Sequence, residues 1–199
     1  PYIERREIGS DAVDYISLEN FSYCNMRCTY CSPKYYGGTE ASYNAAKVIE
    51  ELTNKCGGLN QDCHVVWGGG EPTLSPRFKP VNEHLISTNA VTKVRVLSNS
   101  LKHSDQLHSL IADKRVHLVT SIDAGTPLVF REIRGKGDIA KVIENLQAYS
   151  TTMKEKRRLT IKYILMPNNA SSSELESFVL LMLEACLLYT SDAADDRMR

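Results

Sequence analysis

The segment that decides the fold and the chemistry is CNMRCTYC, residues 24–31. It places Cys24, Cys28 and Cys31 in the spacing C-x₃-C-x₂-C, and no fourth cysteine follows closely. A [4Fe–4S] cluster normally takes four cysteine thiolates, so three of them leave one iron without a protein ligand. An open coordination position distinguishes a reactive metal site from a structural one. The spacing therefore predicts a cluster with one free iron.

A structural zinc site is the alternative for these cysteines. Tetrahedral zinc takes four ligands, so a fourth Cys or His should stand at short spacing. The candidates are Cys56, Cys63 and His64, which lie beyond a predicted helix. We therefore favour the cluster and interpret Cys56 and Cys63 as small buried residues.

A second motif, Gly68-Gly69-Gly70-Glu71-Pro72, follows the cysteine loop. Together the two motifs resemble the radical S-adenosylmethionine (SAM) superfamily, over about residues 13–185. The resemblance implies an enzyme in which Cys24, Cys28 and Cys31 hold a [4Fe–4S] cluster, with the amino and carboxylate groups of SAM on the fourth iron. It also implies the reaction. An electron passed through the cluster splits SAM into methionine and a 5′-deoxyadenosyl radical, which abstracts hydrogen from a substrate.

The motif details look most like the branch that contains molybdenum-cofactor biosynthesis and peptide-modifying (SPASM-type) enzymes. That branch implies a small-molecule or peptide substrate and an electron donor such as flavodoxin or ferredoxin. Many of its members carry further Fe–S clusters in a C-terminal extension; we interpret this chain as a truncated core, so the absence of such an extension carries no meaning. The alternative function is a non-catalytic Fe–S electron-transfer or binding module. Such a module would recruit Cys56 or Cys63 as a fourth ligand and would not need Gly69-Gly70-Glu71.

Short apolar runs alternate with amphipathic stretches along the chain. The predicted strands are 13–18, 64–67, 94–97, 117–123 and 160–166. The helical stripes between and after them are 45–52, 78–85, 104–112, 139–146 and 175–182. Five strand–loop–helix units predict a parallel α/β sheet, and the resemblance implies a partial (β/α)₆ TIM-like barrel without its sixth strand. An open doubly wound sheet is the alternative, but its G-x-G-x-x-G fingerprint is absent.

Polar residues and proline indicate where the helices begin. Ser42 and Asp138 are predicted N-caps, and Pro76 is predicted to open the second helix. Ser171 and Glu174 have the spacing of a capping box ahead of the last helix.

The loops after the carboxyl ends of barrel strands carry function. The cysteine loop and Gly69-Gly70-Glu71 follow consecutive strands, so we expect them to lie side by side. The two glycines would let the backbone approach a ligand closely. The Glu71 carboxylate and nearby carbonyl groups would then accept hydrogen bonds from the methionine amine of SAM.

Further SAM contacts follow from the resemblance, which places polar residues at the ends of later strands. The matching positions are Asn99, Ser121 and Asp123. Ser121 and Asp123 should share one face of their strand because side chains alternate. Tyr30 offers adenine an aromatic face, with a core aromatic as the alternative, and Asn99 is equally suited to a turn.

Lys162 interrupts the apolar run 160–166. A buried, unpaired ammonium group is costly, so we expect Lys162 to point into the barrel and meet a carboxylate of SAM or substrate. The alternative places it near the start of the strand with its amine in solvent. Arg131 and Arg134 either reach the same carboxylate or project from a solvated helix.

Composition limits the remaining classes. The chain has 24 Lys and Arg residues against 24 Asp and Glu residues, so there is no basic footprint for nucleic acid. The sequence contains no eighteen-residue apolar run that would span a membrane and no signal-peptide core. Six cysteines, three of them clustered, favour a reducing cytoplasm over a disulfide scaffold. Residues 1–185 are predicted to form one domain, and residues 186–199 look like a translated sequencing adapter.

Overall fold

The structure of the protein is a computed structural model. It describes residues 12–32, 38, 41–55, 57–153, 158–185 and 187. The predicted adapter-derived tail lies outside these residues apart from Leu187, and so does Cys56.

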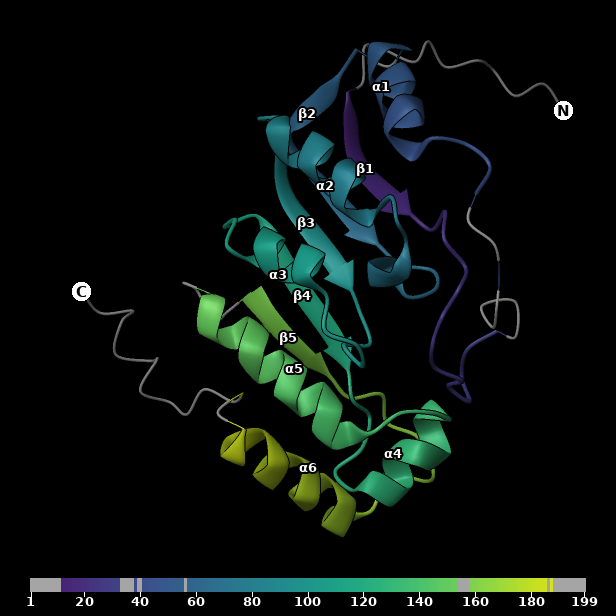
Figure 1. The fold of residues 1–199 in the computed structure, drawn as a ribbon, viewed down its shortest axis with the longest axis vertical. Helices are drawn as coiled ribbons and strands as arrows, with labels where there is room; N and C mark the ends of the chain where they lie inside the picture. The colour runs from purple at the N-terminus through teal and green to yellow at the C-terminus, as the bar shows by residue number, and fades with distance from the viewer. Residues whose placement is uncertain are drawn as a thin grey trace, which may run out of the picture.

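Five parallel strands form one sheet, in the order β1-β2-β3-β4-β5 (Figure 1). They are β1 (Val13–Leu18), β2 (Leu59–Trp67), β3 (Val91–Leu97), β4 (Val116–Ser121) and β5 (Leu159–Lys162). Each strand lies beside the next one in sequence, with helical segments between them. The predicted parallel α/β sheet is therefore confirmed.

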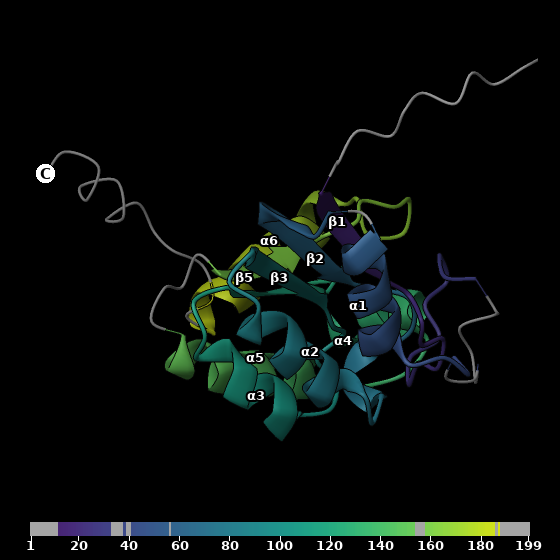
Figure 2. The same ribbon diagram turned by 90° about the horizontal axis from the view of Figure 1, so that it is seen from above.

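The helices are α1 (Ala45–Lys55), the short 3₁₀ turn η2 (Pro72–Leu74), α2 (Phe78–Ser87), α3 (Asp105–Ile111), α4 (Pro127–Arg134), α5 (Ile139–Thr152) and α6 (Ser172–Glu184). Figure 2 shows α1, α2, α3 and α5 together on one side of the sheet. Helix α6 lies along α5, where the Gln147 side chain donates to the Ala185 carbonyl at 3.3 Å. Among the described residues, no helix is long and apolar enough to cross a bilayer.

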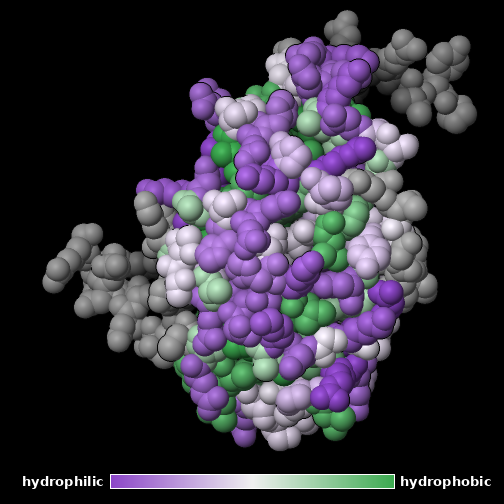
Figure 3. Space-filling view, in the orientation of Figure 1, coloured by the Kyte–Doolittle hydropathy of each residue, from purple (hydrophilic) through white to green (hydrophobic). Residues whose placement is uncertain are grey.

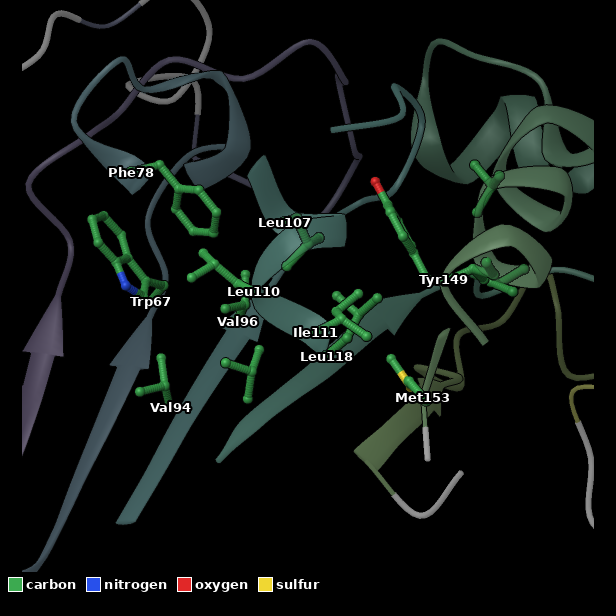
Figure 4. Packing of buried hydrophobic residues seen from close by; sticks show 14 of the residues in the cluster. Trp67, Phe78, Val94, Val96, Leu107, Leu110, Ile111, Leu118, Tyr149 and Met153 are labelled. Atoms are coloured by element: carbon green, nitrogen blue, oxygen red, sulfur yellow. The ribbon is translucent and has the colours of Figure 1, made fainter. Parts of the chain in front are cut away.

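The core lies between the sheet and these helices. In β4 the residues Val116, Leu118 and Thr120 are buried, whereas the residues between them are not. Trp67 of β2 packs edge-to-face on Phe78 of α2, with ring centroids 5.3 Å apart (Figure 4). Burial of such side chains is the main stabilising contribution to a fold of this kind. The outer surface of this helical side is mostly hydrophilic (Figure 3).

The opposite face of the sheet carries the alternate strand residues and is called the open face below. Its members include His64 on β2, Arg95 and Leu97 on β3, His117, Val119 and Ser121 on β4, and Thr160 and Lys162 on β5. None of them is fully buried. This face, together with the loops at the carboxyl ends of the strands, is where the predicted site residues lie.

Strand β5 ends earlier than predicted, at Lys162 instead of Met166. The backbone that follows is hydrogen-bonded to side chains and not to a strand. The Ile164 N–H donates to Asp123 Oδ1 at 2.8 Å, and the Ile164 carbonyl accepts from Asn169 Nδ2 at 2.9 Å. Two side chains thus replace the strand ladder after Lys162.

Two predicted helix starts are wrong. Asn44, and not Ser42, caps α1, because Asn44 Oδ1 accepts from the Ala46 N–H at 3.1 Å. Helix α2 begins at Phe78 after Arg77, so Pro76 stands just outside it. In α1 itself only Ala45 and Ile49 of the predicted stripe are buried.

The predicted capping box is only half present. Ser171 caps α6 by accepting from the Glu174 N–H at 3.3 Å. The Glu174 carboxylate does not return to the cap but accepts from the N–H groups of Gly125 and Thr126, at 2.6 Å and 3.0 Å. It joins α6 to the start of α4, a helix whose bounds the sequence patterns did not predict.

Candidate active site

A cavity of about 180 Å³ lies at the carboxyl ends of the strands. It brings together ten of the eleven predicted site residues: Cys24, Cys28, Tyr30, Cys31, Gly69, Gly70, Glu71, Asn99, Ser121 and Lys162. The eleventh, Asp123, does not line it. Motifs that are far apart in the sequence therefore meet at one edge of the sheet, where a parallel barrel places its reactive groups.

The Gly-Gly-Glu turn holds the first half of the cysteine loop. The Gly70 N–H donates to the Phe21 carbonyl and the Glu71 N–H to the Tyr23 carbonyl, both at 2.8 Å. A Cβ at Gly70 would lie 2.2 Å from the Tyr23 carbonyl oxygen, and Gly69 has a φ of +82°. We expected the glycines to make room for a ligand. The structure shows that they make room for the backbone of the cysteine loop; their approach to a ligand stays a prediction.

Helix α4 holds the second half of the same loop. The Arg27 N–H donates to the Arg134 carbonyl at 3.0 Å and the Thr29 N–H to the Ile133 carbonyl at 2.8 Å. Gly135 ends α4 with a φ of +69°, and a Cβ there would lie 2.2 Å from the Arg27 carbonyl oxygen. The signals for this helix were a threonine and proline at its start and a glycine at its end.

Glu71 lines the cavity but is almost fully buried. Its carboxylate accepts four hydrogen bonds: from the Thr73 N–H at 3.3 Å, the Thr73 hydroxyl at 2.6 Å, the Ser98 hydroxyl at 2.8 Å and the Asn99 N–H at 2.7 Å. A carboxylate has about four lone-pair positions, so its capacity is filled. Burial raises the pKa of Glu71, and these hydrogen bonds oppose the rise. The carboxylate connects the turn after β2 to the end of β3, and its contact with the SAM amine stays a prediction.

Asn99 contacts the cysteine loop directly. Its Nδ2 lies 3.6 Å from Cys24 Sγ and donates to Asn25 Oδ1 at 2.7 Å. Its Oδ1 accepts from the Leu101 N–H at 2.9 Å. Asn99 is thus both a turn residue and a neighbour of a predicted metal ligand, and the two alternatives that the sequence left open do not exclude each other.

Asp123 is fully buried behind the cavity. Strand β4 ends at Ser121 and Asp123 has a φ of +62°, so the expected alternation with Ser121 does not reach it. Its Oδ2 accepts from the Tyr30 hydroxyl at 2.7 Å and from Arg134 Nη1 at 3.1 Å. In this structure Asp123 positions two residues that line the cavity, Tyr30 and Arg134, and its contact with SAM stays a prediction.

The Tyr30 hydroxyl also accepts from Arg134 Nη1, so Tyr30, Asp123 and Arg134 form one buried network. Arg134 is only 4% exposed and lines the cavity. Its Nε atom is buried without a hydrogen-bond partner among the described residues. Arg131, the other arginine considered from the sequence, is exposed.

Ser121 and Lys162 are register partners on β4 and β5, and both line the cavity. Lys162 is exposed, yet it lines the cavity as expected, and its contact with a carboxylate of SAM or substrate stays a prediction. It is the last residue of an edge strand, which lets its ammonium group stay hydrated at the mouth of the cavity.

The donor set fits an iron–sulfur cluster better than a single zinc ion. Burial raises the pKa of Cys24, Cys28 and Cys31, so their thiolate forms need a cationic partner such as iron. Among the described residues, no three Cys, His, Asp or Glu side chains lie close enough to bind one metal ion. Zinc would need its sulfur ligands about 2.3 Å from a single point, whereas thiolates on three different irons stand farther apart. Cys63, fully buried, does not line the cavity.

Comparison with known protein families decides the family. Residues 21–178 match the model of the Radical SAM superfamily. The chain belongs to this superfamily. Members of the radical SAM superfamily use a [4Fe–4S] cluster and SAM, the two groups that the cysteine spacing and the family resemblance predicted.

The radical SAM chain also has curated relatives. It is 27% identical to the GTP 3′,8-cyclase of Aeromonas hydrophila over 139 residues, which cover 67% of this chain and 41% of that enzyme. It is 25% identical to the GTP 3′,8-cyclase of Alkaliphilus oremlandii over 185 residues, which cover 90% and 55%. The chain spans about half the length of the curated relatives it matches.

Solved structures show the same fold. Streptococcus suis SuiB bound to S-adenosylmethionine matches with a TM-score of 0.65 at 18% identity, covering 88% of this chain and 39% of SuiB. The structure of native anSMEcpe with bound AdoMet and Cp18Cys peptide matches with a TM-score of 0.69 at 18% identity, covering 89% of this chain and 49% of anSMEcpe. The predicted fold class, a partial TIM-like barrel of parallel strands, is confirmed for this radical SAM chain.

Proposed function

We propose that residues 1–185 form the SAM-cleaving core of a radical SAM enzyme. One observation carries the proposal: Cys24, Cys28, Cys31 and the Gly69-Gly70-Glu71 turn line one cavity. The three thiolates would hold a [4Fe–4S] cluster, and SAM would occupy the iron that they leave free. When bound, the cluster supplies the electron that splits SAM into methionine and a 5′-deoxyadenosyl radical, which takes hydrogen from the substrate.

The residues around the cysteines would orient SAM and exclude water. Asn99 positions Cys24 through its side-chain amide, 3.6 Å from the sulfur. The Tyr30 ring would face adenine while its hydroxyl is fixed by Asp123. Ser121 and Lys162 at the mouth would meet the ribose and carboxylate groups. The alignment of cofactor and substrate, rather than new chemistry, is the protein's contribution to such a reaction.

The comparisons favour a small molecule over a peptide as the substrate. The GTP 3′,8-cyclases match this chain at 25–27% sequence identity, whereas the structures solved with the SuiA and Cp18Cys peptides share the fold at 18%. A flavodoxin or ferredoxin would supply the electron. The clustered cysteines favour a reducing compartment, and we assign the protein to the cytoplasm.

Anaerobic reconstitution tests the proposal. We expect about four irons and four sulfides per chain, a change in the cluster's electron paramagnetic resonance spectrum when SAM is added, and 5′-deoxyadenosine after reduction. Cys28→Ala should abolish 5′-deoxyadenosine formation, whereas Cys63→Ala, a buried thiol outside the cavity, should retain it. Nucleoside formation by Cys28→Ala would contradict the assignment. A cluster that SAM leaves unchanged would indicate an electron-transfer module instead.

A further inference from the structure

The open face of the sheet carries basic side chains next to the cavity, on the side toward the amino ends of the strands. Leu97 and Val119 line the cavity and are register partners on β3 and β4. Arg95 and His117 stand two residues earlier on the same strands and are also partners. Side chains two residues apart in a strand point the same way and lie about 6.6 Å apart. Arg95 and His117 therefore form the next row of this face.

A further row lies closer to the amino ends of the strands. His64 on β2 is the register partner of Lys93 on β3, two residues before Arg95. Neighbouring strands are about 4.8 Å apart, so the rows form one patch. We define the basic face as His64, Lys93, Arg95 and His117, with Lys162 at the mouth of the cavity above it.

Within the part of the chain that the structure describes, the cations of the basic face have no carboxylate partners. Among the described residues, none of Lys93, Arg95 and Lys162 lies in an ion pair, and Arg95 Nε is buried without a hydrogen-bond acceptor. Two lysines of the helices differ, because Lys79 pairs with Glu83 and Lys141 with Glu144.

Two more observations define the charge of this surface. Burial lowers the pKa of His117, and the charges of Lys93 and Arg95 lower it further, so both cations act at this ring. Glu19 contributes a carboxylate at the border of the patch, next to Gly68 and Leu97. The excess of positive charge is local, since the whole chain has a net charge of zero.

We infer that the basic face binds the anionic group, phosphate or carboxylate, of a small-molecule substrate whose reactive end extends to the cavity at the carboxyl ends of the strands. The substrate role rests on the proposed function. A guanidinium group matches the geometry of such oxyanions, the nearby ammonium group of Lys93 adds charge, and neutral imidazole rings can donate an N–H. His117, the register partner of Arg95, lies four residues before Ser121 on β4. Arg95 is therefore about 13 Å from Ser121 along the strand direction. The proposed anion site and Ser121 at the cavity are therefore separated by about that distance.

Titration calorimetry with inorganic pyrophosphate and with citrate tests this site on the reconstituted 199-residue chain at low ionic strength. We expect Arg95→Gln and Lys93→Gln each to weaken binding of the preferred anion about tenfold or more, the usual worth of a charged hydrogen bond. Lys79→Gln and Lys141→Gln remove the same charge from the helical side and should leave binding unchanged. A preference for pyrophosphate identifies a phosphate, and a preference for citrate a carboxylate.

Three results would overturn the inference: no binding of either anion, equal binding by the wild type and Lys93→Gln, or equal losses in the two control variants. Circular dichroism checks the fold, and Lys93→Gln decides the test if Arg95→Gln does not fold. SAM cleavage without anion binding overturns this inference alone. Anion binding without SAM cleavage contradicts the proposed function and, with it, the substrate role of the site.

Discussion

Gly70 illustrates how one residue controls the site. A Cβ at this position would lie 2.2 Å from the backbone oxygen of Tyr23, an atom that has no rotamer with which to move away. We expect Gly70→Ala to lower the free energy of unfolding by about 1–3 kcal/mol, the usual cost of overpacking, and to reduce the iron bound on reconstitution. Thermal unfolding and iron analysis measure both effects.

Gly68→Ala is the matched control for this prediction. The nearest atom to a Cβ at Gly68 is the Glu19 carboxylate oxygen at 3.6 Å, an ordinary contact with a movable side chain. Its unfolding midpoint and iron content should stay close to those of the wild type. Equal losses in the two variants would show that the approach of the cysteine loop is not the reason for the glycine.

At the scale of elements, α6 supports α4, and α4 supports the cysteine loop. Glu174 accepts from the Gly125 N–H, the Thr126 N–H and the Thr126 hydroxyl. Thr126 in turn caps α4 by accepting from the Val129 N–H at 3.4 Å. Glu174→Ala leaves these donors without an acceptor, so we expect a loss of about 2 kcal/mol or more in urea unfolding. Glu176→Ala, an exposed carboxylate on the same helix, should lose far less, and a similar loss in both would contradict this coupling.

At the scale of the whole molecule, cluster binding and folding should be coupled. The three cysteines lie in one loop that is fixed by hydrogen bonds to both the β2–α2 turn and α4. Removing iron with an anaerobic chelator should therefore lower the unfolding temperature, by about 2–4 °C for each kcal/mol of binding energy lost. Scanning calorimetry with and without the chelator measures this difference. Cys28→Ala should show no such shift, and an equal shift in that variant would indicate an effect of the chelator itself.

Much of the site could be predicted because its residues form short motifs of characteristic spacing in the sequence. The cysteine triplet, the glycine turn and the polar ends of the strands all lie at the carboxyl edge of a parallel sheet, and ten of eleven predicted residues line one cavity. Strand β1 also begins and ends where its apolar pattern does, at Val13 and Leu18. Periodicity reports burial on one face of an element, which is a property of neighbouring residues.

Three carboxylates make contacts that the sequence did not predict, and the physical reason is the same for all three. Glu71, Asp123 and Glu174 each have a charge suited to a ligand or to a local cap, yet all three bind donors that come from other elements. The direction of a carboxylate depends on which unsatisfied backbone N–H groups the tertiary fold brings near it. The spacing of residues along the sequence does not predict that arrangement.

The sequence by itself therefore determined the cofactor chemistry and the parallel α/β sheet, because three thiols at fixed spacing and alternating apolar runs are local features. Only the tertiary structure decided that Gly70 leaves room for the Tyr23 carbonyl oxygen and that Asp123 accepts hydrogen bonds from Tyr30 and Arg134. It alone also aligned Lys93, Arg95 and His117 on one face. Those facts depend on strand register and on close contacts between distant segments, which exist only once the chain has folded.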